Sequence, residues 1–161
     1  MKHMTRVAAL LLPFAVIACS RGTADDVAPP SEAQRLANAA DTIVVYKTPT
    51  CGCCNDWVDH VREYGYTVVT QDLNDLTQVK QQLGVPAGRV SCHTAVVRGY
   101  TVEGHVPADL IQKMLAERPR FRGLTVPGMP VGSPGMEGPW KDDYDVLAFD
   151  DDGNIEVYAR R

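Results

Sequence analysis

The residues best suited to chemistry are cysteines, and three of the five lie within four positions. They are Cys51, Cys53 and Cys54, in the sequence Cys51-Gly52-Cys53-Cys54. A thiolate is a nucleophile and a ligand for soft metal ions such as Cu(I). Because Cys53 and Cys54 are neighbours, the three thiols cannot each reach a remote disulfide partner without severe crowding. The spacing therefore indicates metal binding or thiol exchange.

Five further residues could extend this site as ligands. Cys92 and His93 are adjacent, and their ordinary interpretations are a buried small side chain and a satisfied polar residue at a strand edge. His105 precedes a predicted helix and could instead be a cap or a surface residue. Met129 and Met136 lie in a segment rich in Gly and Pro, where no periodic core position explains them. Each methionine is therefore a candidate ligand or a cover for the site.

The elements that would position these residues follow from hydrophobic periodicity and turn residues. We expect strands at 42–47 and 66–70, a hairpin of 94–98 with 100–103, and helices from 53 to Gly65 and at 107–117. A further helix should carry Leu76, Val79 and Leu83, with Asp72 or Asn74 as its cap. The three clustered cysteines then fall at a helix N-terminus, where unpaired amides and the helix dipole favour thiolates. His60 falls inside this helix and is expected to be solvated.

This order of elements predicts an α/β fold of the thioredoxin-like type, a central sheet with flanking helices. In that fold the loop before the third core strand lies against the N-terminus of the first helix, which would bring Cys92 and His93 to the cysteine cluster. Residues 119–140 are expected to form a long Gly/Pro-rich loop, which in a compact domain is usually functional or disordered. A β-hairpin of 144–149 and 155–158 should follow it.

The N-terminus predicts export. Lys2 and Arg6 precede an apolar run at 7–18 that is too short to span a bilayer, which is the layout of a secretory signal peptide. Val16-Ile17-Ala18-Cys19 resembles the lipobox of bacterial lipoproteins, in which the cysteine receives lipid; the alternative is a plain cleaved signal. We expect a lipoprotein-type signal peptide at 1–18, a tether at 19–41 and one domain at 42–161, in the periplasm or cell envelope.

Composition limits the partners. The chain has 161 residues, enough for one domain, and a formal charge of −4, which becomes −6 once Lys2 and Arg6 are removed. A net negative charge of this size does not favour binding to nucleic acid. Contact with the membrane is expected only through the lipid on Cys19.

Several motifs in one order resemble the exported CopG-type proteins associated with copper resistance in Gram-negative bacteria, formerly a domain of unknown function and unrelated to the plasmid repressors of that name. The resemblance covers about residues 42–159. It rests on Tyr46-Lys47-Thr48-Pro49-Thr50-Cys51-Gly52-Cys53-Cys54, Trp57, Ser91-Cys92-His93-Thr94-Ala95, Glu103-Gly104-His105-Val106-Pro107-Ala108, Val126-Pro127-Gly128-Met129-Pro130 and Gly132-Ser133-Pro134-Gly135-Met136-Glu137. It implies a thioredoxin-type fold that binds copper through the Cys-x-Cys-Cys motif, and it leaves open whether metal binding is coupled to thiol redox state.

Three functions remain open. The first, which we favour, is non-catalytic binding of Cu(I), in one ion or a multinuclear cluster, with copper-efflux or other envelope copper proteins as partners. The second is an enzyme, a thiol or copper oxidoreductase that uses Cys51 and Cys54, although Cys53 would compete for every mixed disulfide. The third is a structural zinc site, for which adjacent Cys53 and Cys54 are awkward. Storage, transfer and redox roles for copper are not distinguished.

Overall fold

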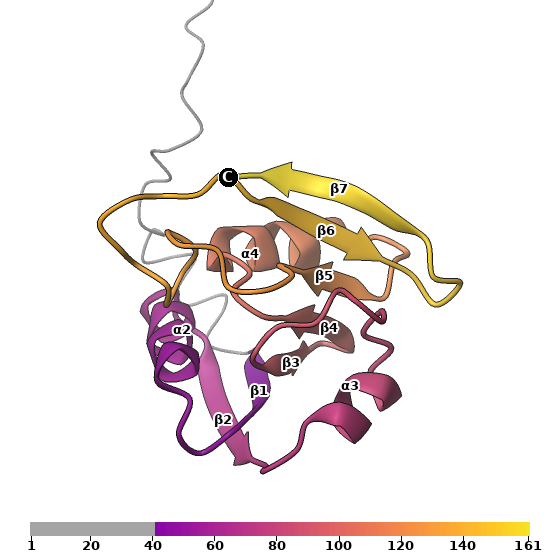
Figure 1. Cartoon of the computed structure of the whole chain (residues 1–161). Coiled ribbons are helices and arrows are strands. Elements are labelled where there is room, and N and C mark those ends of the chain that lie inside the picture. The colour runs from indigo at the N-terminus through magenta and orange to yellow at the C-terminus, as the bar shows by residue number, and fades with distance from the viewer. Residues whose placement is uncertain (1–40) are drawn as a thin grey trace, which may run out of the picture.

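The chain is organised around a mixed sheet (Figure 1). Its first strand contains the β-branched, apolar segment Ile43-Val44-Val45. The computed structural model describes residues 41–161. The predicted signal peptide, Cys19 and all but the last residue of the predicted tether lie outside these residues. The elements are β1 (Thr42–Lys47), α2 (Gly52–Glu63), β2 (Thr67–Asp72), α3 (Thr77–Gln82), β3 (Thr94–Val97), β4 (Tyr100–Glu103), α4 (Ala108–Glu117), β5 (Gly123–Thr125), β6 (Asp145–Phe149) and β7 (Ile155–Arg160).

The seven strands form one sheet in the order β2-β1-β3-β4-β5-β6-β7. β1 pairs with β2 and β4 with β5 in parallel, each pair joined by a crossover helix, and the remaining neighbours are antiparallel. The predicted α/β class is confirmed, whereas its assignment to the thioredoxin-like type stays a prediction. In the described part of the chain, every helix is too short or too polar to cross a membrane.

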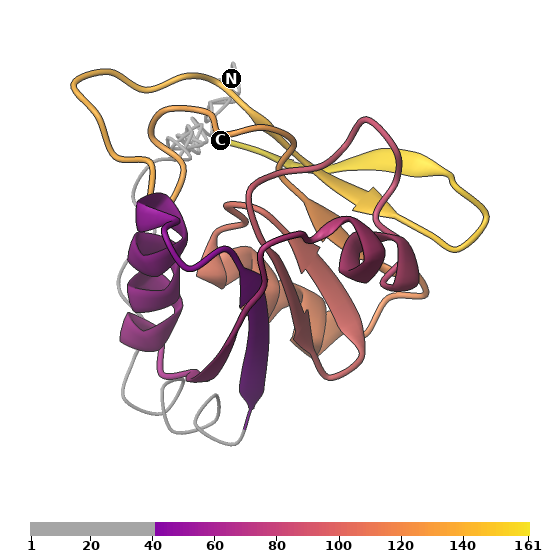
Figure 2. The ribbon, with the colours of Figure 1, turned by 60° about the horizontal axis from the view of Figure 1, so that its bottom comes forward.

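The two faces of the sheet differ in chemistry. One cross-strand row is apolar throughout: Val45, Ala95, Val102, Leu124 and Ala148 are paired in register and buried. It forms the core with the apolar sides of α2 and α4, which include Trp57 and Ile111. The neighbouring row, Thr94, Glu103 and Thr125, is polar and faces α3 and the loop after it. Figure 2 shows α3 and α4 on opposite sides of the sheet.

The sequence prediction was wrong at two places in this fold. Residues 119–140 contain strand β5, whose three residues are too few to show a period-2 pattern beside so many glycines. Gly123 is required there because a Cβ would overlap the carbonyl of Thr101 in the neighbouring strand. The N-cap of α3 is Leu76 rather than Asp72 or Asn74, and Asp75 Oδ1 accepts the hydrogen bond of Thr77 N at 2.8 Å.

Candidate metal centre

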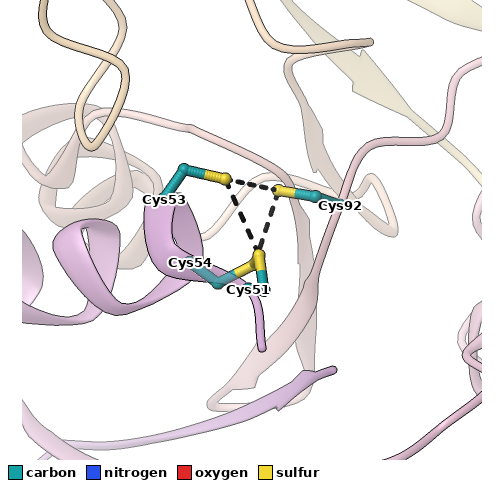
Figure 3. A group of neighbouring side chains, drawn as sticks. All are labelled: Cys51, Cys53, Cys54 and Cys92. Atoms are coloured by element: carbon teal, nitrogen blue, oxygen red, sulfur yellow. Dashed lines mark hydrogen bonds between the residues drawn. A yellow bond between two sulfur atoms is a disulfide. The ribbon is translucent and has the colours of Figure 1, made fainter. Parts of the chain in front are cut away.

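Four cysteine sulfurs converge at the N-terminus of α2 (Figure 3). Cys51 is the N-cap, and its sulfur forms a disulfide with Cys54 one turn later. Cys53 Sγ lies 3.6 Å from Cys51 Sγ and 3.8 Å from Cys92 Sγ. Cys54 Sγ lies 3.5 Å from Cys92 Sγ. The free thiols among the described residues are therefore Cys53 and Cys92, which touch each other and the disulfide.

Sheet register brings Cys92 to this helix. β1 and β3 are antiparallel, with Tyr46 opposite Thr94, so the chain leaves β1 at the edge where it enters β3. The residues just after β1 and just before β3 must then be neighbours. This confirms the prediction that the loop carrying Cys92 and His93 lies against the start of the first helix.

Two histidines approach the sulfur of Cys92. His105 Nε2 lies 3.0 Å from Cys92 Sγ, and His93 Nδ1 lies 3.4 Å from it. The Nδ1–H of His105 donates to the Pro134 carbonyl at 2.8 Å, which leaves the Nε2 lone pair directed at the sulfur. Both imidazoles are completely buried, and their rings meet edge to face at 5.1 Å between centroids. The ring of Trp57 covers His93 at 4.5 Å.

Burial also sets the protonation of these groups. It lowers the pKa of His93 and of His105 below the usual histidine value, so both rings are neutral at neutral pH. Burial, reinforced by the nearby Cys53, raises the pKa of Cys92 to about 12. Without metal the site is thus a neutral thiol beside two neutral imidazoles. Binding of a cation displaces the thiol proton, because the thiolate is the ligand.

A buried carboxylate holds the Cys92 loop from behind. Glu103 Oε1 accepts hydrogen bonds from Lys80 Nζ and from Ser91 N, both at 2.6 Å, and Oε2 accepts one from the Thr94 hydroxyl at 2.6 Å. Burial raises the pKa of Glu103, although Lys80 opposes this shift. The sequence motif contains Glu103, but no role was predicted for it. Its expected position opposite Thr94 in the hairpin could have indicated that the two side chains form a hydrogen bond.

The Gly/Pro-rich loop after β5 passes close to the N-terminal end of α2 (Figure 2). Gly135 packs so tightly on the first turn of α2 that a Cβ there would lie 2.6 Å from the Cys53 carbonyl oxygen. Met136 follows Gly135 and is half-buried, whereas Met129 is 51% exposed. The loop reaches the metal centre through Pro134 and Gly135. A ligand role for either methionine stays a prediction.

The prediction for His60 was wrong. Its Nε2 accepts a hydrogen bond from Ala108 N at 3.1 Å, so it satisfies an amide in the first turn of α4 and is half-buried rather than solvated. Burial lowers its pKa. The helical pattern of α2 alone could not show that α4 begins beside this position.

Comparisons with known proteins agree with the geometry of the site. A family model described as "Protein of unknown function, DUF411" matches residues 89–136, which include Cys92, His93 and His105. No curated protein sequence matches the chain.

Two solved structures match most of it. "Copper resistance protein copG- Form 2" is 46% identical, with a TM-score of 0.71, and the match covers 75% of this chain and 98% of that one. "Copper resistance protein copG- Form 1" gives the same identity and TM-score over 74% and 96%. Because nearly the whole length of those proteins is matched at this identity, the chain belongs to the CopG family of copper resistance proteins.

Proposed function

We propose that this chain binds Cu(I) through Cys51, Cys53, Cys54 and Cys92 and contributes to copper resistance or homeostasis. The observation that carries the proposal is the convergence of four sulfurs from two distant segments, with all four atoms within 4.8 Å of one another. Two solved structures at 46% identity, both named for the copper resistance protein copG, support copper as the metal.

The distances between sulfurs suit shared metal ions. Two ligands that each lie about 2.3 Å from one tetrahedral ion are about 3.8 Å apart. The contacts of Cys92 Sγ with Cys53 and Cys54, at 3.8 and 3.5 Å, match this separation. For all four sulfurs to bind, the disulfide must first be reduced by two electrons, which yields the thiols of Cys51 and Cys54. Four thiolates this close can bridge several Cu(I) ions, so a multinuclear cluster is the favoured form.

A thiol-disulfide oxidoreductase is the second candidate, and the Cys51–Cys54 disulfide favours it. Its spacing is that of exchanging pairs in thiol oxidoreductases. Against it, Cys53 Sγ lies 3.6 Å from Cys51 Sγ and would attack any mixed disulfide formed there.

The cellular setting is proposed from the sequence alone. Residues 1–18 would direct export, Cys19 would carry the lipid in the periplasm or envelope, and residues 42–161 would form the metal-binding domain. Copper-efflux or other envelope copper proteins would be its partners.

The test is an anaerobic titration of the reduced protein with Cu(I) and with Zn(II) against competing chelators. We expect Cu(I) to be held far more tightly than Zn(II), and Cys53→Ser and Cys92→Ser each to bind fewer ions. Asn55→Ser, on the exposed surface of the same helix, is the matched control and should bind as the unaltered protein does. Equal retention of both metals, or unchanged binding in both cysteine variants, would refute the proposal.

A further inference from the structure

Strand β2 forms one edge of the sheet, beside β1, and no described residue pairs with its outer side (Figure 1). Every side chain of the strand except that of Val68 is exposed, and Val69 is 43% exposed. An edge strand presents unpaired N–H and C=O groups, which another strand can bind.

The bonds between β2 and β1 show which of these groups are free. The N–H groups of Thr67 and Leu73 both donate to carbonyls of the segment 41–47. Successive residues of a strand in a parallel pair point their N–H and C=O groups to opposite sides, so the odd-numbered residues of β2 bond to β1. The groups of Val68 and Thr70 therefore point outward.

The two edges of the sheet differ in how they are protected against pairing. The other edge, β7, carries the exposed charges of Glu156 and Arg160 and has a register shift against β6, and both features discourage a further strand. In β2, the residues before Asp72 include no charge and no proline, and the register with β1 is regular. Asp72 itself is paired with Lys47 at 3.0 Å. Of the two edges, β2 is the one open to pairing.

We propose that β2 pairs antiparallel with β2 of a second copy of this chain, so that two molecules form a weak dimer with one continuous sheet. The support for a second copy is that the strand is complementary to itself. About a twofold axis perpendicular to the sheet, one residue faces its own copy. With Val69 on this axis, Val68 of one molecule and Thr70 of the other exchange both backbone hydrogen bonds through their outward groups.

The side chains are compatible in this register. The exposed Val69 meets its own copy on one face of the sheet, and Val68 meets Thr70 on the other. Thr67 lies opposite Gln71. No like charges face each other, and the pairs that include β-branched residues stabilise the contact.

Other positions of the axis are less favourable. With Val68 on the axis, Thr70 would have to pair with Tyr66, whose N–H already donates to the Val61 carbonyl at 3.3 Å. With Thr70 on the axis, the carboxylate of Asp72 would lie opposite the apolar Val68. With Asp72 on the axis, two carboxylates would face each other, which destabilises a strand pair.

The size of the contact makes the dimer weak. The strand has six residues, whereas a stable interface has about 20–30 residues on each side. We therefore expect the dimer to form only at high protein concentration. The proposal goes beyond the proposed function and does not depend on the metal.

The test uses the purified full-length protein without metal, under reducing conditions that exclude an intermolecular disulfide. Sedimentation velocity, from micromolar to millimolar protein, measures the dissociation constant of the dimer. Val69→Lys should raise it by about fivefold or more, because two like charges then face each other across the axis. Val69→Glu alone should do the same, whereas an equal mixture of the two variants should dimerise again, since position 69 of one molecule faces position 69 of the other.

Val157→Lys is the matched control, because Val157 lies on β7 and is 46% exposed, close to the value for Val69. It should dimerise as the unaltered protein does, and thermal melts should show that each variant is folded. If Val69→Lys does not fold, Thr70→Pro replaces it, since it removes an outward N–H and no bond to β1. A protein that is monomeric at every concentration, a dimer unchanged in Val69→Lys or in Thr70→Pro, a mixture that stays monomeric, or a dimer lost in Val157→Lys would overturn the proposal.

Discussion

Glu103→Gln is the substitution that tests most directly how the metal centre is supported. Gln keeps the size of the side chain and an acceptor for Ser91 N, so packing is preserved. It removes the negative charge that faces Lys80 at 2.6 Å. The side chain of Lys80 is only 14% exposed and that of Glu103 is not exposed at all, so solvent cannot replace the lost partner.

The size of the effect follows from these contacts. Removing one partner of a buried ion pair costs about 3–5 kcal/mol, because the other charge is left uncompensated. Lys80 Nζ retains the Thr94 hydroxyl at 2.9 Å and some access to water, which places the expected loss near the lower limit. We therefore expect the free energy of unfolding to fall by about 3 kcal/mol. Since Ser91 adjoins Cys92, we also expect weaker Cu(I) binding.

The assay is urea unfolding of the metal-free protein, with the midpoint compared at an unchanged m-value. Glu156→Gln, an exposed glutamate on β7, is the matched control and should shift the unfolding free energy by less than about 0.5 kcal/mol. The double variant Lys80→Met with Glu103→Gln should be more stable than the sum of the two single losses predicts, because no charge is then left unpaired. A loss below about 1 kcal/mol, or strictly additive effects, would show that the ion pair does not support the site.

Three further predictions follow from features described above. Gly135→Ala should displace the loop from the Cys53 carbonyl, lower the free energy of unfolding by about 1–3 kcal/mol and weaken Cu(I) binding. The control is Gly153→Ala, which is also at positive φ but has open space around it and should leave Cu(I) binding unchanged. Burial lowers the pKa of His60, so as the pH drops from 7 to 5 the unfolded chain binds a proton before the folded protein does, and the free energy of unfolding should fall. His60→Gln should reduce the slope of the unfolding free energy against pH by up to about 1.4 kcal/mol per pH unit. An unchanged slope in His60→Gln would contradict this prediction. A fatty-acid analogue should label the protein but not Cys19→Ser in cells, and equal labelling of both would exclude lipidation at that position.

Hydrophobic periodicity in the sequence correctly predicted the elements that depend on residues close together in the chain. The helix with Trp57, Val58 and Val61 on its apolar side and the hairpin of β3 with β4 follow from periodicity, and the structure confirms both. Antiparallel pairing of β1 with β3 then places Cys92 at the cluster, which the expected order of elements anticipated.

The sequence-based predictions failed where contacts between segments distant in the chain determine the structure. β5 is a strand because β4 offers it a pairing edge, although three residues beginning with glycine have little strand propensity. His60 is half-buried because α4 begins against α2, a contact between segments distant in sequence. The carbonyl of Pro134 that orients His105 belongs to the loop after β5, and no motif spacing could have linked the two.

The dispersal of the metal centre along the chain has a consequence for the order in which the protein is made and loaded. A chain synthesised from its N-terminus presents Cys51, Cys53 and Cys54 before Cys92 exists, and long before Pro134 can orient His105. During that interval the three thiols form a flexible segment, and unfolded cysteines bind metals without the selectivity of a finished site. On the proposed function, discrimination between copper and zinc would belong to the folded protein, and correct loading would require that folding precede the arrival of the metal.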